Sequence, residues 1–217
     1  MVRQGVRMRH VIVSRSVPGF LPSTHGLHFA NRFEPGPTVR LGLLDPRLIG
    51  VGDASAGLCG GMAWLVREWF EAGRPIPADT TPPANGTPLF RVIVRRHVRS
   101  LDWLRGPWQF WRAAALGGKG LGERSIDTVD PRVRAAIDAG RLVLLGLIRH
   151  RGPNPFDLAG DHTVLAYGYD RDIGRGETTF RIYDPNWPDR DDVTITLARD
   201  RLVQSTGEPL HGIIALG

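Results

Sequence analysis

Cysteine is nearly absent from this sequence, because Cys59 is the only one among 217 residues. A single cysteine excludes an internal disulfide framework and any metal site built from several cysteines. We therefore expect a protein of a reducing compartment, with no metal and no cofactor. Cys59 is also the only thiol in the chain that could carry chemistry.

Long apolar runs are missing as well. The N-terminal segment is positively charged, but the only apolar run that follows it before Ser14 is Val11–Val13, which is too short for the core of a signal peptide. Nowhere do the roughly 18 consecutive apolar residues of a membrane span occur. We expect a soluble, cytoplasmic protein with no membrane partner.

Lysine is the third scarce residue: Lys119 is the one lysine among 28 basic residues, and the formal net charge is +6. The arginines allow two interpretations, a basic surface for an acidic partner or a general preference for arginine codons, and the second is favoured. No basic tract, zinc-finger spacing or RNA-binding aromatic motif occurs, so no nucleic acid partner is expected. Gly120 follows Lys119 where a P-loop needs Ser or Thr, and the glycine-rich stretch 117–122 is expected to be a flexible flap.

The rest of the composition is that of an ordinary globular protein, with 41% hydrophobic and 23% charged residues. A length of 217 residues suits one domain. Prolines and glycines punctuate residues 1–50, which predicts an irregular N-terminal arm. Residues 51–140 carry helical patterns, and residues 141–217 carry strand patterns. This order predicts an α+β domain in which a helical layer packs on a C-terminal antiparallel sheet.

The expected elements follow from periodicity and from start and stop signals. Asp130 is expected as an N-cap with Pro131 at the first helical position, and Gly140 ends that helix. The expected helices are residues 59–72, 89–104, a short one from 107, and 130–139. The expected strands are residues 142–148, 162–169, 178–183, 193–197 and 212–216.

Cys59 falls in the first turn of its expected helix. A helix start presents unpaired N–H groups and a partial positive charge, which favour thiolate over thiol and can hold a developing oxyanion. Because the thiolate is the nucleophilic form, Cys59 is a candidate nucleophile. The alternative is that Cys59 is a small buried hydrophobe, the commonest role of a lone cysteine.

A histidine and a carboxylate are expected to meet on the sheet. Folding the chain about a turn near Ile173 places His162 opposite Asp184 on one face, and directly paired residues have Cβ atoms about 4.5 to 5.5 Å apart. Asp184 would then orient the imidazole. Alternatively, His162 is an ordinary residue at a strand start and Asp184 an ordinary Asp-Pro turn opener. Asn186 is a second candidate orienting residue, ranked below Asp184.

Together these motifs resemble the papain-like cysteine peptidases, nearest to the bacterial branch that cleaves double-glycine leaders. The resemblance covers about residues 53 to 197: a cysteine followed by Gly60 and Gly61 opens a helix, a histidine begins a strand, and an aspartate ends the next strand. It implies Cys59 as nucleophile, His162 as general base and then acid, and Asp184 as the orienting residue.

The resemblance also implies a papain-like fold. Gly60, Gly61 and Trp187 are candidate substrate contacts. Trp187 is expected either as an aromatic lid or as a packed surface residue. One position departs from the family, which usually places a glutamine six residues before the cysteine as an oxyanion donor, where this chain has Asp53. A carboxylate would repel an oxyanion, so either Ser55, Asn31 or another group is expected to supply the second donor, or the fold is kept without the activity.

The expected function is a cysteine hydrolase that cleaves a peptide or another amide. The expected substrates include proteins. Two alternatives use the same fold: a catalytically silent binding module, which Asp53 favours, and an acyltransferase that delivers the acyl group to an amine. A metal site built from Cys59, His162 and Asp184 is not expected, because no two of these ligands have the short spacing that would organise one.

Overall fold

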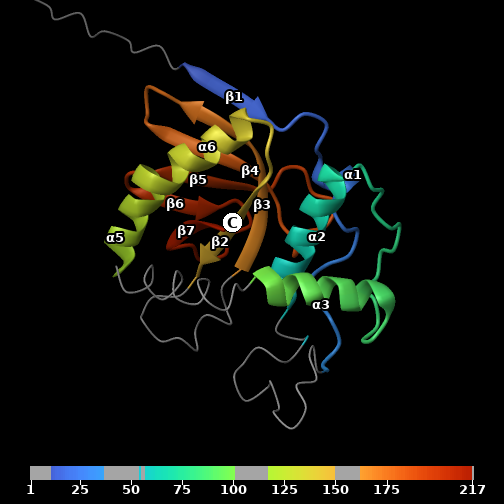
Figure 1. The fold of residues 1–217 in the computed structure, drawn as a ribbon. Coiled ribbons are helices and arrows are strands. Elements are labelled where there is room, and N and C mark those ends of the chain that lie inside the picture. The colour runs from blue at the N-terminus through green and yellow to red at the C-terminus, as the bar shows by residue number, and fades with distance from the viewer. Residues whose placement is uncertain (1–10, 37–53, 55–56, 101–116, 150–161, 217) are drawn as a thin grey trace, which may run out of the picture.

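A computed structural model describes residues 11–36, 54, 57–100, 117–149 and 162–216. These residues form a mixed structure of helices and one antiparallel sheet (Figure 1), so the expected α+β class is confirmed. The short helix expected from Pro107 lies outside the described residues, as do Asp53 and Ser55. No helix within the described ranges has the length and apolar character needed to cross a membrane.

The sheet has seven strands in the order β6-β5-β4-β3-β2-β7, with β1 paired to the far half of β3. Every pairing is antiparallel. Figure 1 shows that the sheet is strongly curled. The strands are β1 (Ile12–Ser16), β2 (Val143–Ile148), β3 (His162–Asp172), β4 (Glu177–Tyr183), β5 (Thr194–Ala198), β6 (Arg201–Gln204) and β7 (Gly212–Leu216).

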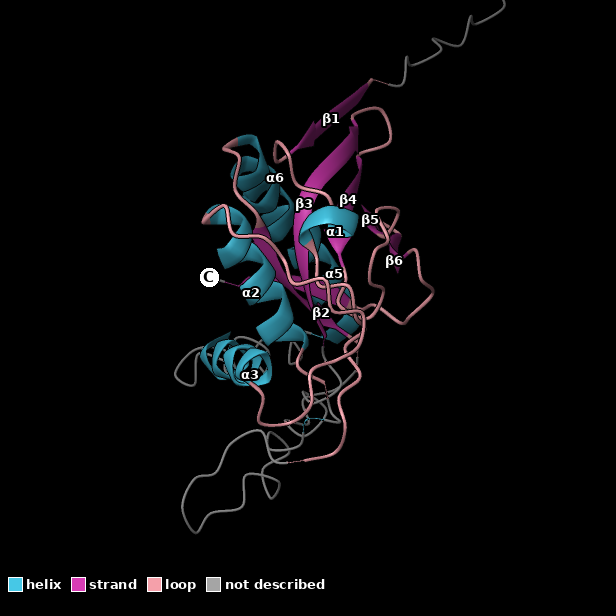
Figure 2. Cartoon of the chain, turned by 90° about the vertical axis from the view of Figure 1, so that its right-hand side faces the viewer, coloured by secondary structure: helices cyan, strands magenta, loops and turns pink. Residues whose placement is uncertain are grey.

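Most helices precede the sheet strands in the chain, as the patterns predict. In Figure 2, α2, α3 and α6 lie on one side of the sheet strands. Contacts join α2 to both α3 and β3, and join α6 to β1, β2 and β3. The helices are α1 (Pro22–His25), α2 (Cys59–Glu71), α3 (Pro88–Ser100), α5 (Gly117–Arg124), the π-helix η3 (Ser125–Val129) and α6 (Asp130–Asp138).

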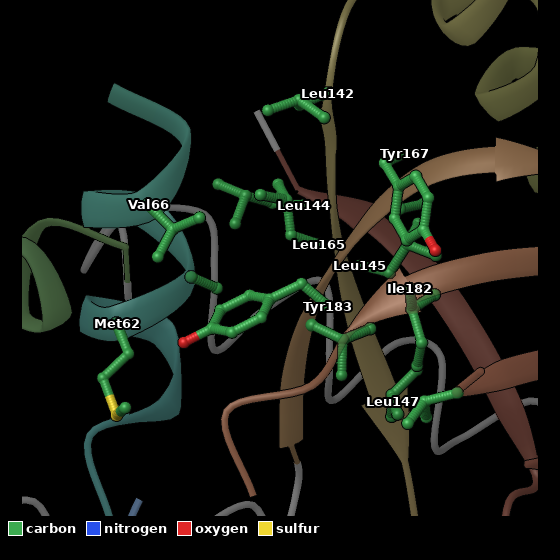
Figure 3. Packing of buried hydrophobic residues seen from close by; sticks show 14 of the residues in the cluster. Met62, Val66, Leu142, Leu144, Leu145, Leu147, Leu165, Tyr167, Ile182 and Tyr183 are labelled. Atoms are coloured by element: carbon green, nitrogen blue, oxygen red, sulfur yellow. The ribbon is translucent and has the colours of Figure 1, made fainter. Parts of the chain in front are cut away.

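The core between α2 and the sheet fixes where the start of α2 can lie. Leu165 pairs with Tyr183, so their side chains share one face of the sheet. Figure 3 shows the ring of Tyr183 extending from that face toward Met62 and Val66 of α2. All of these side chains are completely buried. Because such contacts hold α2 along its length, its first turn is held at the end of the sheet where β3 begins.

Two expectations for the helical part are wrong. The stretch 117–122 is not a flexible flap but part of α5. Leu121 of α5 is buried against β7, where it fills the space that a side chain at Gly212 would occupy. Asp130 is not an N-cap, since the preceding residue Val129 is itself helical and the chain turns continuously from α5 through η3 into α6. Instead, the Asp130 carboxylate binds Arg134 at 3.0 Å.

The β3–β4 hairpin has a register that the sequence did not predict. The pairs Leu165 with Tyr183 and Asp172 with Glu177 lie two and three residues away from the expected register. The two pairs differ because a bulge interrupts β3 between Ala166 and Gly168. Without that extra residue, Asp184 would align with Leu165 and lie on the opposite face from His162. The bulge therefore brings these two side chains to the same face.

Candidate active site

Cys59 is the first residue of α2, and the turn before it has a conformation that favours glycine. Gly57 has a φ of +92°, a backbone conformation that residues other than glycine rarely adopt. A Cβ atom at Gly57 would also lie 2.6 Å from Nδ2 of Asn31. Leu58 follows as the N-cap, with no side-chain hydrogen bond of its own. The position of Cys59 therefore depends on a glycine turn and on the asparagine beside it.

Asn31 holds that turn from the N-terminal arm. Its Oδ1 accepts a hydrogen bond of 2.6 Å from the backbone N–H of Leu58, which no helical carbonyl could satisfy. Its Nδ2 donates to Oδ1 of Asn186 at 3.3 Å, and its backbone N–H donates to the carbonyl of Pro185 at 2.9 Å. Asn31 thus links the turn before the cysteine to the loop after β4.

His162 and Asp184 form a buried pair. The ring atom Nε2 of His162 lies 2.6 Å from Oδ1 of Asp184, and the two residues are only 4% and 1% exposed. A carboxylate can only accept, so Nε2 carries the hydrogen. The other ring nitrogen, Nδ1, is the one left to interact with the Cys59 thiol, whose pKa the imidazole lowers. His162 lies at the start of β3 and Asp184 directly after β4.

Three donors hold the carboxylate of Asp184. Besides His162, the backbone N–H of Asn186 donates to Oδ1 at 2.8 Å, and Nε2 of Gln204 donates to Oδ2 at 2.7 Å. Although burial alone would raise the pKa of Asp184, the hydrogen bond and charge of His162, the N–H of Asn186 and the charge of Arg149 lower it. Asp184 is therefore a carboxylate at neutral pH.

The thiol and the imidazole alter each other's ionisation. Burial alone would raise the pKa of Cys59, but the charge of His162 and hydrogen bonds from its ring and from the backbone of Thr163 and Gly60 lower it. Burial alone would lower the pKa of His162, but the thiolate and the bonds to Asp184 and Cys59 raise it to about 9. These opposite shifts favour a thiolate and imidazolium pair at neutral pH.

The three candidate substrate contacts lie in different surroundings. The backbone N–H of Gly60 is among the groups that lower the pKa of Cys59. Gly61 is where α3 crosses α2, since a Cβ there would collide with the carbonyl of Ile93. Trp187 is partly buried against the core, and its Nε1 donates to Glu208 at 3.1 Å. Gly60 thus lies next to the sulfur, Gly61 serves the packing of two helices, and the side chain of Trp187 is packed on the core and bound to Glu208.

The candidate oxyanion and orienting groups also separate. Ser55 lies outside the described residues. Asn31 lies beside the start of α2 with one Nδ2 hydrogen donated to Asn186. The side chain of Asn186 is therefore an acceptor for Asn31, while only its backbone N–H reaches Asp184. The carboxylate of Asp184, not the amide of Asn186, contacts His162.

Gln204 and Arg149 belong to the site but were missed in the sequence. Gln204 closes β6, a short strand that the pattern did not predict, and Arg149 directly follows β2. Both are distant from Asp184 in the sequence, and neither belongs to a motif that contains Asp184. The only local signal was the apolar pair Leu202 and Val203 between polar residues 201 and 204, which is too short to identify a strand.

Among the described residues, no group of three or more His, Cys, Asp and Glu side chains is arranged to hold a metal ion. The chain matches no family model, no curated protein and no solved structure. The geometry of the site is therefore the basis for assigning a function. It combines a thiol of lowered pKa, an adjacent imidazole and a buried carboxylate, a combination suited to nucleophilic attack on a carbonyl.

Proposed function

We propose that this protein is a papain-like cysteine hydrolase that cleaves a peptide or another amide through a thioester acyl-enzyme. The observation that carries the proposal is the buried pair of His162 and Asp184, 2.6 Å apart, next to a Cys59 thiol whose pKa the imidazole lowers. Nucleophile, base and orienting acid come from a helix start, a strand start and a strand end. That placement matches the one that the resemblance to papain-like peptidases implies.

The first half of the reaction forms the acyl-enzyme. The Cys59 thiolate attacks the substrate carbonyl carbon, and the carbonyl π electrons move to oxygen as an oxyanion. The N–H groups in the first turn of α2 favour that negative charge. When the oxyanion collapses, the C–N bond breaks, and the imidazolium Nδ1–H gives its proton to the departing amine. The products are a thioester on Cys59, a free amine and neutral His162.

The second half releases the acid. Neutral His162 accepts a proton from water through Nδ1 while the water oxygen attacks the thioester carbonyl. The C–S bond then breaks, which returns the Cys59 thiolate and the imidazolium. Asp184 keeps the proton of Nε2 in place throughout, so that Nδ1 always faces the reaction. In total, one amide and one water give one carboxylic acid and one amine.

The second oxyanion donor is assigned to Asn31 among the described residues. Its Nδ2 carries two hydrogens, and only one is donated to Asn186. Its oxygen is bound to Leu58, which fixes the orientation of the amide and leaves Nδ2 beside Gly57 in the turn before Cys59. This role would replace the usual glutamine, whose position Asp53 occupies.

The test is labelling of Cys59 followed by turnover. We expect iodoacetamide at pH 6.5 to alkylate Cys59 at least about tenfold faster than a free thiol of pKa about 8.5. A mixed fluorogenic peptide library should be cleaved by the wild type and not by Cys59→Ala, whose fold should be retained. His162→Gln should slow both alkylation and cleavage. Alkylation at the rate of an ordinary thiol would contradict the proposal.

A silent binding module is the second candidate, because Cys59 is only 9% exposed. It predicts slow alkylation and no cleavage of any peptide by the wild type. A thiolate that is reactive but poorly accessible gives a different result: slow alkylation by iodoacetamide, but rapid oxidation of Cys59 by the smaller hydrogen peroxide. The two reagents, used side by side on wild type and His162→Gln, distinguish an inert thiol from a shielded thiolate. An acyltransferase would transfer the acyl group to an added amine in the same assay.

A further inference from the structure

Strand β6 brings one polar side chain into the interior. It is a four-residue strand at the edge of the sheet, paired only with β5 among the described strands. Its first three residues are exposed or partly exposed, and Gln204 alone is buried, with 3% of its surface accessible. A buried amide lowers stability unless it is hydrogen-bonded. Its surroundings therefore indicate what it does there.

Both ends of the Gln204 amide are occupied. Nε2 donates to Oδ2 of Asp184 at 2.7 Å, and Oε1 accepts from Arg149 at 3.1 Å. A guanidinium can only donate and a carboxylate can only accept. With the amide turned over, its oxygen would face the carboxylate and its NH₂ would face the guanidinium. Arg149 and Asp184 together therefore permit a single orientation of Gln204.

That orientation restricts the carboxylate in turn. A carboxylate rotates readily about its last side-chain bond, because that torsion is broad and two-fold. His162 and the N–H of Asn186 both bind Oδ1 of Asp184, whereas Gln204 donates to Oδ2. Without Gln204, Oδ2 would lose this buried hydrogen bond. The carboxylate would then be held only through Oδ1, and the orientation of its plane would be less restricted.

We propose that Gln204, oriented by Arg149, is a positioning residue that locks the Asp184 carboxylate in the plane that holds the His162 ring against Cys59. The inference rests on the proposed function for its consequence in catalysis. The hydrogen bond between His162 and Asp184, on which Gln204 acts, can be measured whether or not the protein turns over a substrate. Gln204 touches neither the substrate carbonyl nor the sulfur, so it acts only through Asp184.

The test compares Gln204→Met with a matched control on the same strand, Val203→Thr. Methionine keeps the length of the side chain and removes the donor. Val203 is 42% exposed, and threonine suits a strand as well as valine. Proton NMR follows the Nε2–H of His162, which is assigned by its loss in Asp184→Ala, and iodoacetamide alkylation at pH 6.5 follows Cys59.

In Gln204→Met we expect the Nε2–H signal to move upfield and to exchange with water about tenfold faster. We expect alkylation of Cys59 to slow about fivefold, and both quantities to be unchanged in Val203→Thr. A purely structural Gln204 would lower the thermal midpoint of unfolding and leave the Nε2–H signal of the folded protein unchanged. That result would overturn the inference.

A second variant covers the case in which Gln204→Met does not fold. Gln204→Asn keeps an amide but is one methylene shorter, so it cannot reach Asp184 and Arg149 together, and the same two readouts decide. The hydrolase proposal fails separately, when wild-type Cys59 reacts like an ordinary thiol. In that event the Nε2–H signal still decides whether Gln204 positions Asp184: a shift supports the inference, and an unchanged signal overturns it.

Discussion

The two sides of the candidate site are built differently. On the sheet side, Asp184 is 1% exposed and has three donors between 2.6 and 2.8 Å. On the helix side, the turn that delivers Cys59 depends on Gly57 and on one bond from Leu58 to the partly exposed Asn31. The histidine and its acid are fixed by several independent contacts, whereas the cysteine turn depends on two residues.

This difference predicts which substitutions should lower stability and which should lower the reactivity of Cys59. Loss of a buried charge partner on the sheet side leaves polar groups unpaired, which is costly to the whole fold. Loss of Asn31 or Gly57 changes the local path of the chain before α2, while the core contacts of α2 remain. We therefore expect changes on the sheet side to lower stability and activity together, and changes on the helix side to affect mainly the reactivity of Cys59.

The largest effect is expected for Asp184→Ala. This change leaves His162 and Gln204 without their buried acceptor, so the free energy of unfolding should fall by about 3 to 5 kcal/mol. Urea denaturation measures it. The matched control is Asp192→Ala, which removes an exposed carboxylate paired with Arg190 and should leave the unfolding midpoint unchanged. A stable Asp184→Ala variant would mean that the buried pair contributes little to the fold.

The pH dependence of Cys59 alkylation should show the next largest effect. Because the pKa of Cys59 is lowered, the thiolate persists at pH values where a free thiol is protonated, and the rate at pH 6 should exceed that of a free cysteine at least about tenfold. His162→Gln removes the charge that lowers this pKa. Its rate should therefore rise with pH only near the value of an ordinary thiol or above it.

The same pair sets an upper pH limit for cleavage. The pKa of His162 is raised to about 9, so the stabilisation that this shift gives to the fold is complete below the usual histidine pKa and is lost as pH rises through about 9. Cleavage needs the imidazolium as acid and should fall over the same interval, while alkylation needs only the thiolate and should not. Parallel pH profiles of the two reactions would contradict this assignment.

Elements with strong local patterns were predictable. The helix at Cys59, with its stop at Gly73, the strand that begins at His162 and the strand that ends just before Asp184 follow from apolar spacing and turn residues, and the structure confirms them. The helix α5 was not predicted, because its glycines favour irregular structure and its tertiary contact through Leu121 is not visible in a local window.

The arrangement of the site was only partly predictable. The sequence predicted that His162 meets Asp184, but the register was wrong, and the contact is made because the bulge in β3 restores the shared face. Whether a strand bulges depends on packing with its neighbours, which no pattern along the strand records. Gln204 and Arg149 were missed for the same reason: contacts between separate strands have no sequence spacing of their own.

A smaller effect, confined to the helix side, is expected for Gly57→Ala. Strain at a φ of +92° and the approach to Asn31 should lower stability by about 1 to 3 kcal/mol and slow Cys59 alkylation about tenfold. Gly86→Ala is the matched control, since Gly86 has a φ of +84° and a Cβ atom there would meet nothing within 4 Å. It should lose stability through backbone strain alone. Equal alkylation rates in the two variants would show that the turn does not place the cysteine.

The smallest effect on stability and on the alkylation of Cys59 is expected for Asn31→Ala. The variant removes the side-chain acceptor for the Leu58 N–H at the start of α2, a capping interaction that contributes about 1 kcal/mol. We expect alkylation of Cys59 to slow about threefold while the Nε2–H signal of His162 stays in place, because the sheet side keeps all its donors. Asn85→Ala is the control, since the Asn85 side chain bonds to exposed carbonyls of the arm, both at 3.3 Å. If Asn31→Ala shifted the histidine signal as strongly as Gln204→Met, the two sides of the site would be one coupled unit, and Asn31 would act on His162 through Asn186.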